Sequence, residues 1–161
     1  MKGNIIVGQS GGPTAVINSS LAGVFSAAKE LGVKKIYGMH HGIQGFLAED
    51  IVDMSEYVKN DADVEILKRT PSAFLGSCRY KLKDSRVDDT DYRRILEIFK
   101  KYNIRYFFYN GGNDSMDTCN KVSKYLLEQN YECRIIGVPK TIDNDLFGTD
   151  HCPGYGSAAK Y

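Results

Sequence analysis

The sequence predicts an α/β protein with a doubly wound, mostly parallel sheet, and three observations lead to this fold class. A strand, a turn, a helix and a further strand follow one another twice along the chain. The strand at residues 104–109 is apolar or aromatic at almost every position, as expected when both faces of a strand are covered. The intervening helices carry apolar residues at helical spacing. These patterns are typical of right-handed βαβ units in an open sheet.

The first unit begins with the apolar run 4–8, which predicts a strand that ends in a turn containing Gly11 and Gly12. Pro13 suits the first position of a helix, so we expect the helix to begin there and Gly32 to end it. Residues 35–39 then predict the second strand.

The middle of the chain, residues 39–88, shows no sustained period because glycines and prolines interrupt it. We expect loops there and one short helix at residues 61–69. Regular structure returns with a helix that starts at Asp89 and ends at Asn103, directly before the apolar strand at 104–109.

The second unit continues through a turn at residues 110–115 into a helix that ends near residue 130. The strand that follows at 133–138 ends at Pro139. Residues 157–159 are small and resemble the start of a helix without an apolar face. Either this terminus frays, or the chain is the front part of a longer protein.

Length and composition exclude several classes of function. A chain of 161 residues makes one domain of ordinary size, and 42% hydrophobic with 25% charged residues indicate a globular protein. Because 21 Lys and Arg face 20 Asp and Glu, we expect neither nucleic acid nor an acidic membrane surface as a partner. The absence of a long apolar run and of a signal peptide predicts a cytoplasmic protein.

The cysteines and histidines suggest no chemistry of their own. The four cysteines form no Cys-x-x-Cys pair, so reduced and mostly structural thiols are expected. The adjacent His40 and His41 lack a carboxylate at helical spacing and are expected in a loop rather than at a metal ion.

Two glycine-rich turns predict a phosphate-binding crevice, because ligands of open α/β sheets bind beyond the carboxyl ends of the strands. Gly11 and Gly12 let backbone N–H groups approach an anion at a helix N-terminus, although a tight connection explains them equally well. Gly112 repeats this arrangement in the second turn. Asp114 and Ser115 beside it either contact phosphate or simply cap the helix.

The third turn groups a cation, a hydroxyl and two carboxylates in Lys140, Thr141, Asp143 and Asp145. Phosphoryl transfer needs a base, cationic charge and oxygen ligands for magnesium, and these residue types supply them. In an extended segment both aspartates point to one side while Ile142 anchors the loop. A solvated acidic loop is the alternative. A lone arginine, Arg79, stands in an earlier Gly/Ser turn and suits a bidentate contact to phosphate, though it also fits an ordinary surface position.

The arrangement of these segments resembles the 6-phosphofructokinases over essentially the whole chain. The resemblance implies phosphoryl transfer to the 1-hydroxyl of fructose 6-phosphate, which gives fructose 1,6-bisphosphate. It implies that Asp143 is the general base, that Thr141 contacts the substrate and that Asp145 supports Mg²⁺. The segments that carry the resemblance are residues 10–12, 74–79, 111–115, 139–145 and 148–155.

Two positions imply the pyrophosphate-dependent branch of this family. Members that use ATP usually carry Gly-Gly-Asp-Gly-Ser and a glycine before Thr-Ile-Asp, whereas this chain has Asp114 and Lys140 there. A carboxylate at Asp114 repels the α-phosphate of ATP, and Lys140 adds charge that holds pyrophosphate. Asp114, Lys140 and Arg79 are therefore implied as catalytic residues beside Asp143, in a reversible reaction. The implied donor site comprises Gly11, Gly12, Arg79, Tyr80, Gly112, Asp114, Ser115 and Lys140.

The sequence departs from the family pattern at Asn113, where the family has an aspartate associated with magnesium. A carboxamide binds a hard cation less strongly, so Asn113, Asp145, water and donor phosphates are expected to share the ion. The family's second lobe with its Met-Gly-Arg motif is missing. Residues 1–150 are thus expected to form the donor-binding domain, and residues 151–161 to lead toward an absent sugar-binding lobe, without which the chain is inactive.

Other functions remain as alternatives. One is an ATP-dependent 6-phosphofructokinase, and another is an NAD- or lipid-kinase-like enzyme, which normally lacks the segment 139–145. A third is a non-catalytic module that binds phosphate. For the intact enzyme, the resemblance implies a homodimer or homotetramer that shares its sites across subunits.

Overall fold

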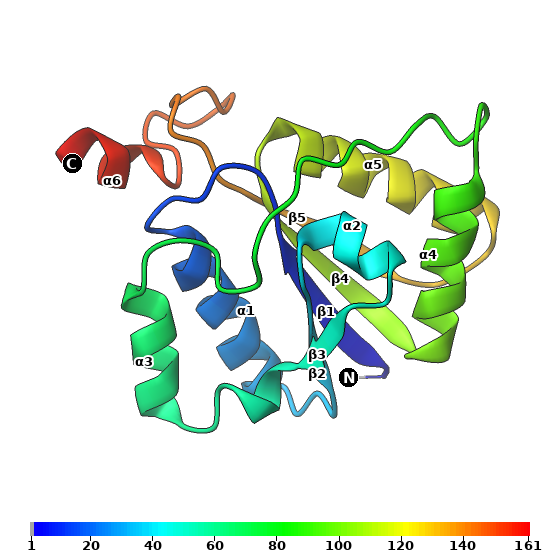
Figure 1. Cartoon of the computed structure of the whole chain (residues 1–161), viewed down its shortest axis with the longest axis horizontal. Helices are drawn as coiled ribbons and strands as arrows, with labels where there is room; N and C mark the ends of the chain where they lie inside the picture. The colour runs from blue at the N-terminus through cyan, green and yellow to red at the C-terminus, as the bar shows by residue number, and fades with distance from the viewer. Residues whose placement is uncertain (1) are drawn as a thin grey trace.

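A five-stranded sheet organises the computed structural model, which describes residues 2–161 (Figure 1). Its strands are β1 (Asn4–Gln9), β2 (Ile36–Met39), β3 (Ile51–Asp53), β4 (Ile104–Gly111) and β5 (Arg134–Pro139). They lie in the order β3-β2-β1-β4-β5, and all neighbours are parallel except β3, which pairs antiparallel with β2. The predicted mostly parallel sheet is confirmed.

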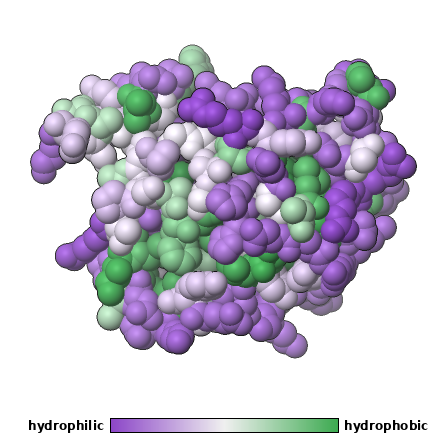
Figure 2. Space-filling view, viewed as in Figure 1, coloured by the Kyte–Doolittle hydropathy of each residue, from purple (hydrophilic) through white to green (hydrophobic). Residues whose placement is uncertain are grey.

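Helices cover both faces of this sheet, which confirms the doubly wound arrangement. The helices are α1 (Ile17–Glu30), α2 (Gly42–Leu47), the 3-10 turn η1 (Met54–Glu56), α3 (Asp61–Arg69), α4 (Thr90–Lys101), α5 (Asn113–Glu128) and α6 (Tyr155–Lys160). In β1, Ile5 and Val7 pack with α1 and α3, while Ile6 packs with α2, α4 and α5 on the other face. On the side drawn in Figure 2, apolar residues gather over α1 and α3, and polar residues cover α4.

Helix α1 begins at Ile17, four residues after the predicted start at Pro13, so that prediction is wrong. Side-chain amides at the ends of two strands hold its first carbonyl. Gln9 Nε2 and Asn110 Nδ2 donate to the Ile17 oxygen at 3.2 and 2.9 Å. These contacts fix the start of the helix against the sheet, and residues 12–16 cross the sheet edge as an irregular loop. The predicted end is confirmed, because Gly32 follows the helix with a φ of +68°.

The middle of the chain contains more regular structure than its sequence pattern indicates. Helix α3 lies at the predicted residues and begins with a capping box, whereas α2, β3 and η1 were not predicted. Helix α2 contains two glycines that packing requires. A Cβ at Gly42 would meet the Tyr109 hydroxyl, and one at Gly45 would collide with the His40 carbonyl. The close approach of α2 to its neighbours thus needs residues that helix propensity assigns to loops.

The second unit follows the prediction closely. Helix α4 starts at Thr90, α5 ends at Glu128 and β5 ends at Pro139. The tail forms the short helix α6, which includes the small residues 157–159. No helix within residues 2–161 is long and apolar enough to cross a membrane.

The cysteines and histidines take structural positions. All four cysteines are free, as expected, and burial raises the pKa of the Cys119 and Cys133 thiols to about 12, which keeps them protonated. His40 Nδ1 lies 3.1 Å from an oxygen of Asp50. In the described part of the chain, no group of three or more His, Cys, Asp or Glu is arranged to hold a metal ion.

Candidate functional site

The turns after β1, β4 and β5 meet at one edge of the sheet, the upper edge in Figure 1, as predicted for parallel strands. They enclose a pocket of about 270 Å³. Arg79 reaches the same pocket from the long segment between α3 and α4. The lining residues are Gly12, Pro13, Arg79, Gly112, Asn113, Lys140, Thr141, Ile142, Asp143 and Asp145.

The turn after β1 lines this pocket with Gly12 and Pro13. Gly11, whose φ of +75° favours glycine, directly precedes them and lies outside the lining. A Cβ at Gly11 would lie 3.8 Å from the Gly112 nitrogen and 3.9 Å from Lys140 Nζ. The expectation that this turn opens a helix N-terminus toward the anion is wrong. Helix α1 starts farther along the chain, at Ile17, whose carbonyl accepts from Gln9 and Asn110, and none of its residues lines the pocket.

The turn after β4 does open a helix at the pocket. Gly112 is the N-cap residue of α5, and no side chain accepts a hydrogen bond at this cap. The alternative of capping by Asp114 or Ser115 is therefore wrong. Since Gly112 and Asn113 line the pocket, the unoccupied N–H groups and the partial positive charge of this helix end face it.

Lys140 directly follows β5 and is buried, with 8% of its surface exposed. Its backbone N–H donates to the Gly111 carbonyl at 3.0 Å, and its ammonium group donates to the Gly12 carbonyl. Burial lowers the pKa of Lys140, the nearby Arg79 lowers it further, and Asp143 acts in the opposite direction. Lys140 thus connects the three turns, since its ammonium group reaches the first turn and its backbone N–H reaches the end of β4.

The loop after Lys140 is bent and not extended, which corrects the sequence prediction. Thr141 Oγ1 donates to Asp145 Oδ1 at 2.8 Å and accepts from the Asp143 N–H at 3.0 Å. Asn144 has a φ of +55°. The bend still leaves Asp143 and Asp145 on the same pocket, although the reason differs from the predicted alternation along a strand.

Ile142 does not anchor this loop, because 54% of its surface is exposed. The anchor is the Asn144 side chain, which accepts from the Cys152 N–H at 2.9 Å and donates to the Asp150 carbonyl at 3.0 Å. The Thr141 N–H also donates to the Pro153 carbonyl at 2.9 Å. Polar contacts to residues 150–153 therefore hold the loop where an apolar contact was expected.

Four predicted donor residues lie outside the pocket lining, namely Gly11, Tyr80, Asp114 and Ser115. Tyr80 donates its hydroxyl to Asp91 at 2.8 Å, and this hydrogen bond raises the pKa of Tyr80. The side chain of Ser115 is buried against Gly111. Asp114 is exposed and pairs with Lys81 at 3.4 Å. Sequence reasoning missed Lys81, which stands two residues after Arg79 and carries the opposite charge to Asp114.

The oxygen donors of the pocket suit a hard divalent cation that keeps part of its water shell. Asn113, Asp143 and Asp145 line one cavity, and one Asp145 oxygen is taken up by Thr141. Mg²⁺ binds proteins through one or two carboxylates and completes its shell with water and phosphate oxygens. The residues present therefore fit a magnesium ion that arrives with a phosphate ligand.

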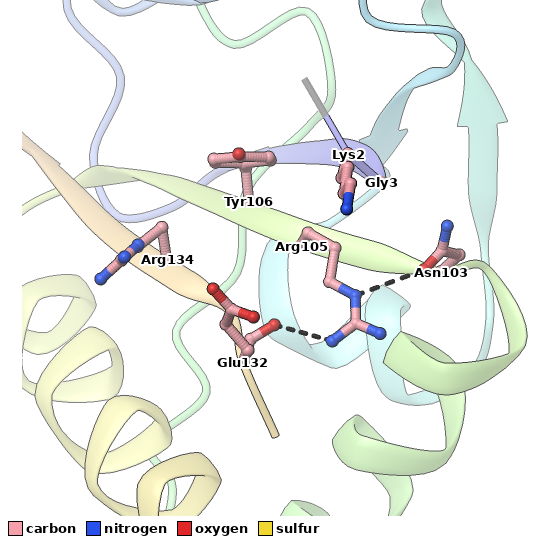
Figure 3. A pocket seen from close by; sticks show the side chains of 7 residues that line it. All are labelled: Lys2, Gly3, Asn103, Arg105, Tyr106, Glu132 and Arg134. Carbon is pink, nitrogen blue, oxygen red and sulfur yellow. Dashed lines mark hydrogen bonds between the residues drawn. The ribbon is translucent and has the colours of Figure 1, made fainter. Parts of the chain in front are cut away.

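A second pocket lies at the opposite edge, at the amino ends of β1, β4 and β5 (Figure 3). Its volume is about 430 Å³, and it contains none of the predicted site residues. Arg105 there donates to Asn103 Oδ1 at 3.3 Å and to the Glu132 carbonyl at 2.9 Å. Arg134 points away from Arg105 in Figure 3, so the basic groups do not converge on one anion.

Comparison with known proteins agrees with this geometry. The phosphofructokinase family model matches residues 4–161. The pyrophosphate–fructose 6-phosphate 1-phosphotransferases of Halomonas elongata and Xanthomonas campestris are 49% and 48% identical to the chain, which covers 38% and 37% of their lengths. The crystal structure of a pyrophosphate-dependent phosphofructokinase from Nitrosospira multiformis matches 98% of this chain and 38% of its own, with a TM-score of 0.90 and 49% identity. The chain spans less than two-fifths of the length of these relatives, and it belongs to the phosphofructokinase family.

Proposed function

We propose that the protein carrying this chain transfers a phosphoryl group from pyrophosphate to the 1-hydroxyl of fructose 6-phosphate. The products are fructose 1,6-bisphosphate and orthophosphate. The observation that carries this proposal is the buried Lys140, whose ammonium group lies in one pocket with Arg79 and Asp143. The names of the relatives that are 43% to 49% identical support the same reaction.

The donor-binding half of the site is basic and rich in backbone N–H groups. Pyrophosphate carries several negative charges in a small volume, and Lys140 and Arg79 supply the opposite charge. The helix N-terminus at Gly112 adds N–H groups that suit phosphate oxygens. Gly12 has no side chain where the first turn lines the pocket, so the donor can approach the backbone there.

Asp143 acts as the general base in this proposal. Its carboxylate takes the proton of the 1-hydroxyl as the sugar oxygen forms a bond to phosphorus, and the bond between that phosphorus and the bridging oxygen breaks. The leaving orthophosphate carries the released electron pair, which Lys140 and Arg79 stabilise. Thr141 holds Asp143 and Asp145 in place, since its hydroxyl already bonds to both residues. The bond that forms between phosphorus and the sugar oxygen is similar in energy to the bond that breaks in pyrophosphate, so the reaction is reversible.

Asn113 and Asp145 would hold a magnesium ion beside the donor phosphates. The ion would supply charge against the phosphoryl oxygens. The two residues come from different turns, and the bound donor completes the site that they begin.

Asp114 and Lys81 limit the donor to pyrophosphate in this proposal. The pair bridges the start of α5 and the segment after Arg79, close in sequence to pocket residues although outside the pocket lining. A nucleoside triphosphate needs room for its α-phosphate and nucleoside beyond the transferred group, and the Asp114 carboxylate repels that phosphate. A donor that ends after two phosphates avoids this contact.

We also propose the wider organisation of the protein. Residues 1–150 form the donor-binding domain, and residues 151–161 lead toward a lobe that binds fructose 6-phosphate. The protein acts in the cytoplasm as a homodimer or homotetramer. Without the sugar-binding lobe, this chain alone has no transferase activity.

The role of Asp143 is tested by Asp143→Asn in the whole enzyme. We expect kcat to fall by about 10²- to 10⁴-fold, because the amide cannot take the hydroxyl proton. Binding of pyrophosphate, measured by calorimetry, should change little. Asp150→Asn is the matched control, since Asp150 lies on the same loop and does not line the pocket. A kcat within threefold of the wild type in Asp143→Asn would refute the role as base.

A further inference from the structure

The segment that carries Arg79 into the pocket, residues 70–79, has no regular secondary structure. It lacks the hydrogen bonds of a helix or a sheet ladder, so other groups must satisfy its buried backbone. Two side chains do this along its first half. They are Gln9 at the end of β1 and Asn18 in the first turn of α1, which are 0% and 1% exposed.

The two amides use both their donor and their acceptor atoms. Gln9 Oε1 accepts from the Leu75 N–H at 2.8 Å, and Gln9 Nε2 donates to Asn18 Oδ1 at 2.9 Å. Asn18 Oδ1 also accepts from the Phe74 N–H at 2.9 Å, and Asn18 Nδ2 donates to the Thr70 carbonyl at 2.9 Å. The pair thus fixes the segment at three backbone positions and connects it to β1 and α1.

The second half of the segment is held by the turn that follows Gln9. Ser10 Oγ and the Gly11 N–H both donate to the Cys78 carbonyl, at 3.2 and 3.3 Å. Ser77 Oγ donates to the Gly11 carbonyl at 2.5 Å. The end of β1, the glycine turn and residues 70–78 therefore form one hydrogen-bonded unit, with Arg79 as the next residue.

We propose that Gln9 and Asn18 are positioning residues that set the place of the Arg79 guanidinium in the donor site. The inference rests on the proposed function, because it assigns Arg79 to the donor. Carboxylates cannot replace these amides, since each amide must donate one hydrogen bond and accept another. A buried backbone group left without its partner is destabilising, so the segment moves when an amide is removed.

The test is a double-mutant cycle between Asn18 and Arg79 in the whole enzyme. Asn18→Ala should lower kcat/KM for pyrophosphate by about 10- to 100-fold, as expected when a contact group shifts by about 1 Å. The KM for fructose 6-phosphate should stay within about twofold. In an Arg79→Ala background, the same change should have an effect of less than about twofold, because the displaced group is already absent.

Ser19→Ala is the matched control. Ser19 follows Asn18 on α1 and donates to the Lys68 carbonyl at 2.6 Å, but it is only partly buried and lies outside the buried pair. We expect this control to leave kcat/KM unchanged. If Asn18→Ala does not fold, Asn18→Ser serves the same cycle, because it leaves a neutral hydroxyl at this buried position and removes the long contacts of the amide.

A merely structural role for Asn18 gives a different result. It lowers the melting temperature but leaves kcat/KM per folded enzyme unchanged, or it adds fully to the effect of Arg79→Ala, and either outcome overturns the inference. Failure of the proposed function appears instead in the wild type, as absence of transfer from pyrophosphate. The cycle is then measured as calorimetric binding of inorganic pyrophosphate, where additive effects still overturn the inference and non-additive effects support it.

Discussion

The two Gly-Gly turns of the sheet share a sequence motif and contribute differently to the pocket. After β4, helix α5 starts one residue beyond Gly112, and its N-terminus faces the cavity. After β1, the helix starts five residues beyond Gly12, and the turn offers a carbonyl that holds the Lys140 ammonium group. In the proposed function, one turn thus receives the anion, and the other holds the cation that meets it.

The difference comes from side-chain contacts at the start of each helix. Gln9 and Asn110 hold the first carbonyl of α1 against the sheet, which delays the helix after β1. No side chain holds or caps the start of α5, so this helix begins as soon as β4 ends. A glycine pair therefore permits a tight approach to phosphate, while the neighbouring polar contacts decide which backbone group is presented.

The largest expected effect comes from removing the cation that the first turn holds. Lys140→Met in the whole enzyme should lower kcat/KM for pyrophosphate by about 10²- to 10³-fold, because the phosphoryl oxygens lose a preorganised charge. Steady-state kinetics measures this change. Lys160→Met on the exposed helix α6 is the control and should have no effect. A loss of less than about threefold in Lys140→Met would mean that the Gly12 carbonyl holds a lysine without a catalytic role.

The same variant should gain stability at neutral pH. Burial lowers the pKa of Lys140 below its usual 10.5, so the folded state bears a penalty while this lysine is protonated. Stability then rises as the pH increases through the folded pKa toward the unfolded one, because the unfolded chain binds the proton more tightly. Lys140→Met should therefore melt at a higher temperature than wild type near pH 7, and the gap should narrow near pH 10. A lower melting temperature at pH 7 contradicts this account.

Replacing Gly11 or Gly112 by alanine should have a smaller effect, and the loss in unfolding free energy should differ between the two turns. Gly11→Ala forces a side chain into a left-handed conformation, at a cost of about 1–2 kcal/mol. Gly112 has a φ of −85°, and the nearest atom to an added Cβ is 3.8 Å away, so Gly112→Ala should change stability by less than about 0.5 kcal/mol. Urea unfolding of the whole enzyme measures both variants. Equal losses would mean that the turns are equivalent after all.

The smallest expected effect concerns the start of α5. Asp114→Ala should change the free energy of unfolding by less than about 1 kcal/mol, because Asp114 makes no capping bond and pairs only with an exposed Lys81. Thermal unfolding measures this change, and the donor preference of the same variant should shift toward ATP. A loss of about 2 kcal/mol in the free energy of unfolding would indicate that Asp114 caps helix α5 after all.

The fold was largely predictable because its signals are local. The apolar strands and the period of α4 and α5 appear in windows of a few residues, and the corresponding elements lie where expected. Helix α2 was missed because its glycines are required by the close approach of Tyr109 and His40, which a local sequence pattern does not show. The start of α1 was misplaced because amides from two strands hold it, and no local pattern encodes that contact.

The sequence predicted which residues form the candidate site better than it predicted how they contact one another. The polar residues after β5 were found from their types, and Asp143 and Asp145 do line one pocket. The Thr141 hydroxyl, which bends the loop, was expected to contact substrate. The contact between Lys140 and Gly12 spans 128 positions and depends on the strand order of the sheet. Such contacts follow from tertiary structure, so residue spacing alone does not reveal them.

The most direct test of the account is a comparison of donors with the whole enzyme, fructose 6-phosphate and Mg²⁺. Formation of fructose 1,6-bisphosphate is followed with pyrophosphate or with ATP as the donor, at matched concentrations. Lys140 and Arg79 in the pocket, together with the Asp114 carboxylate outside its lining, predict a kcat/KM for pyrophosphate at least about 100-fold above that for ATP. An equal or higher kcat/KM for ATP would contradict the proposed donor.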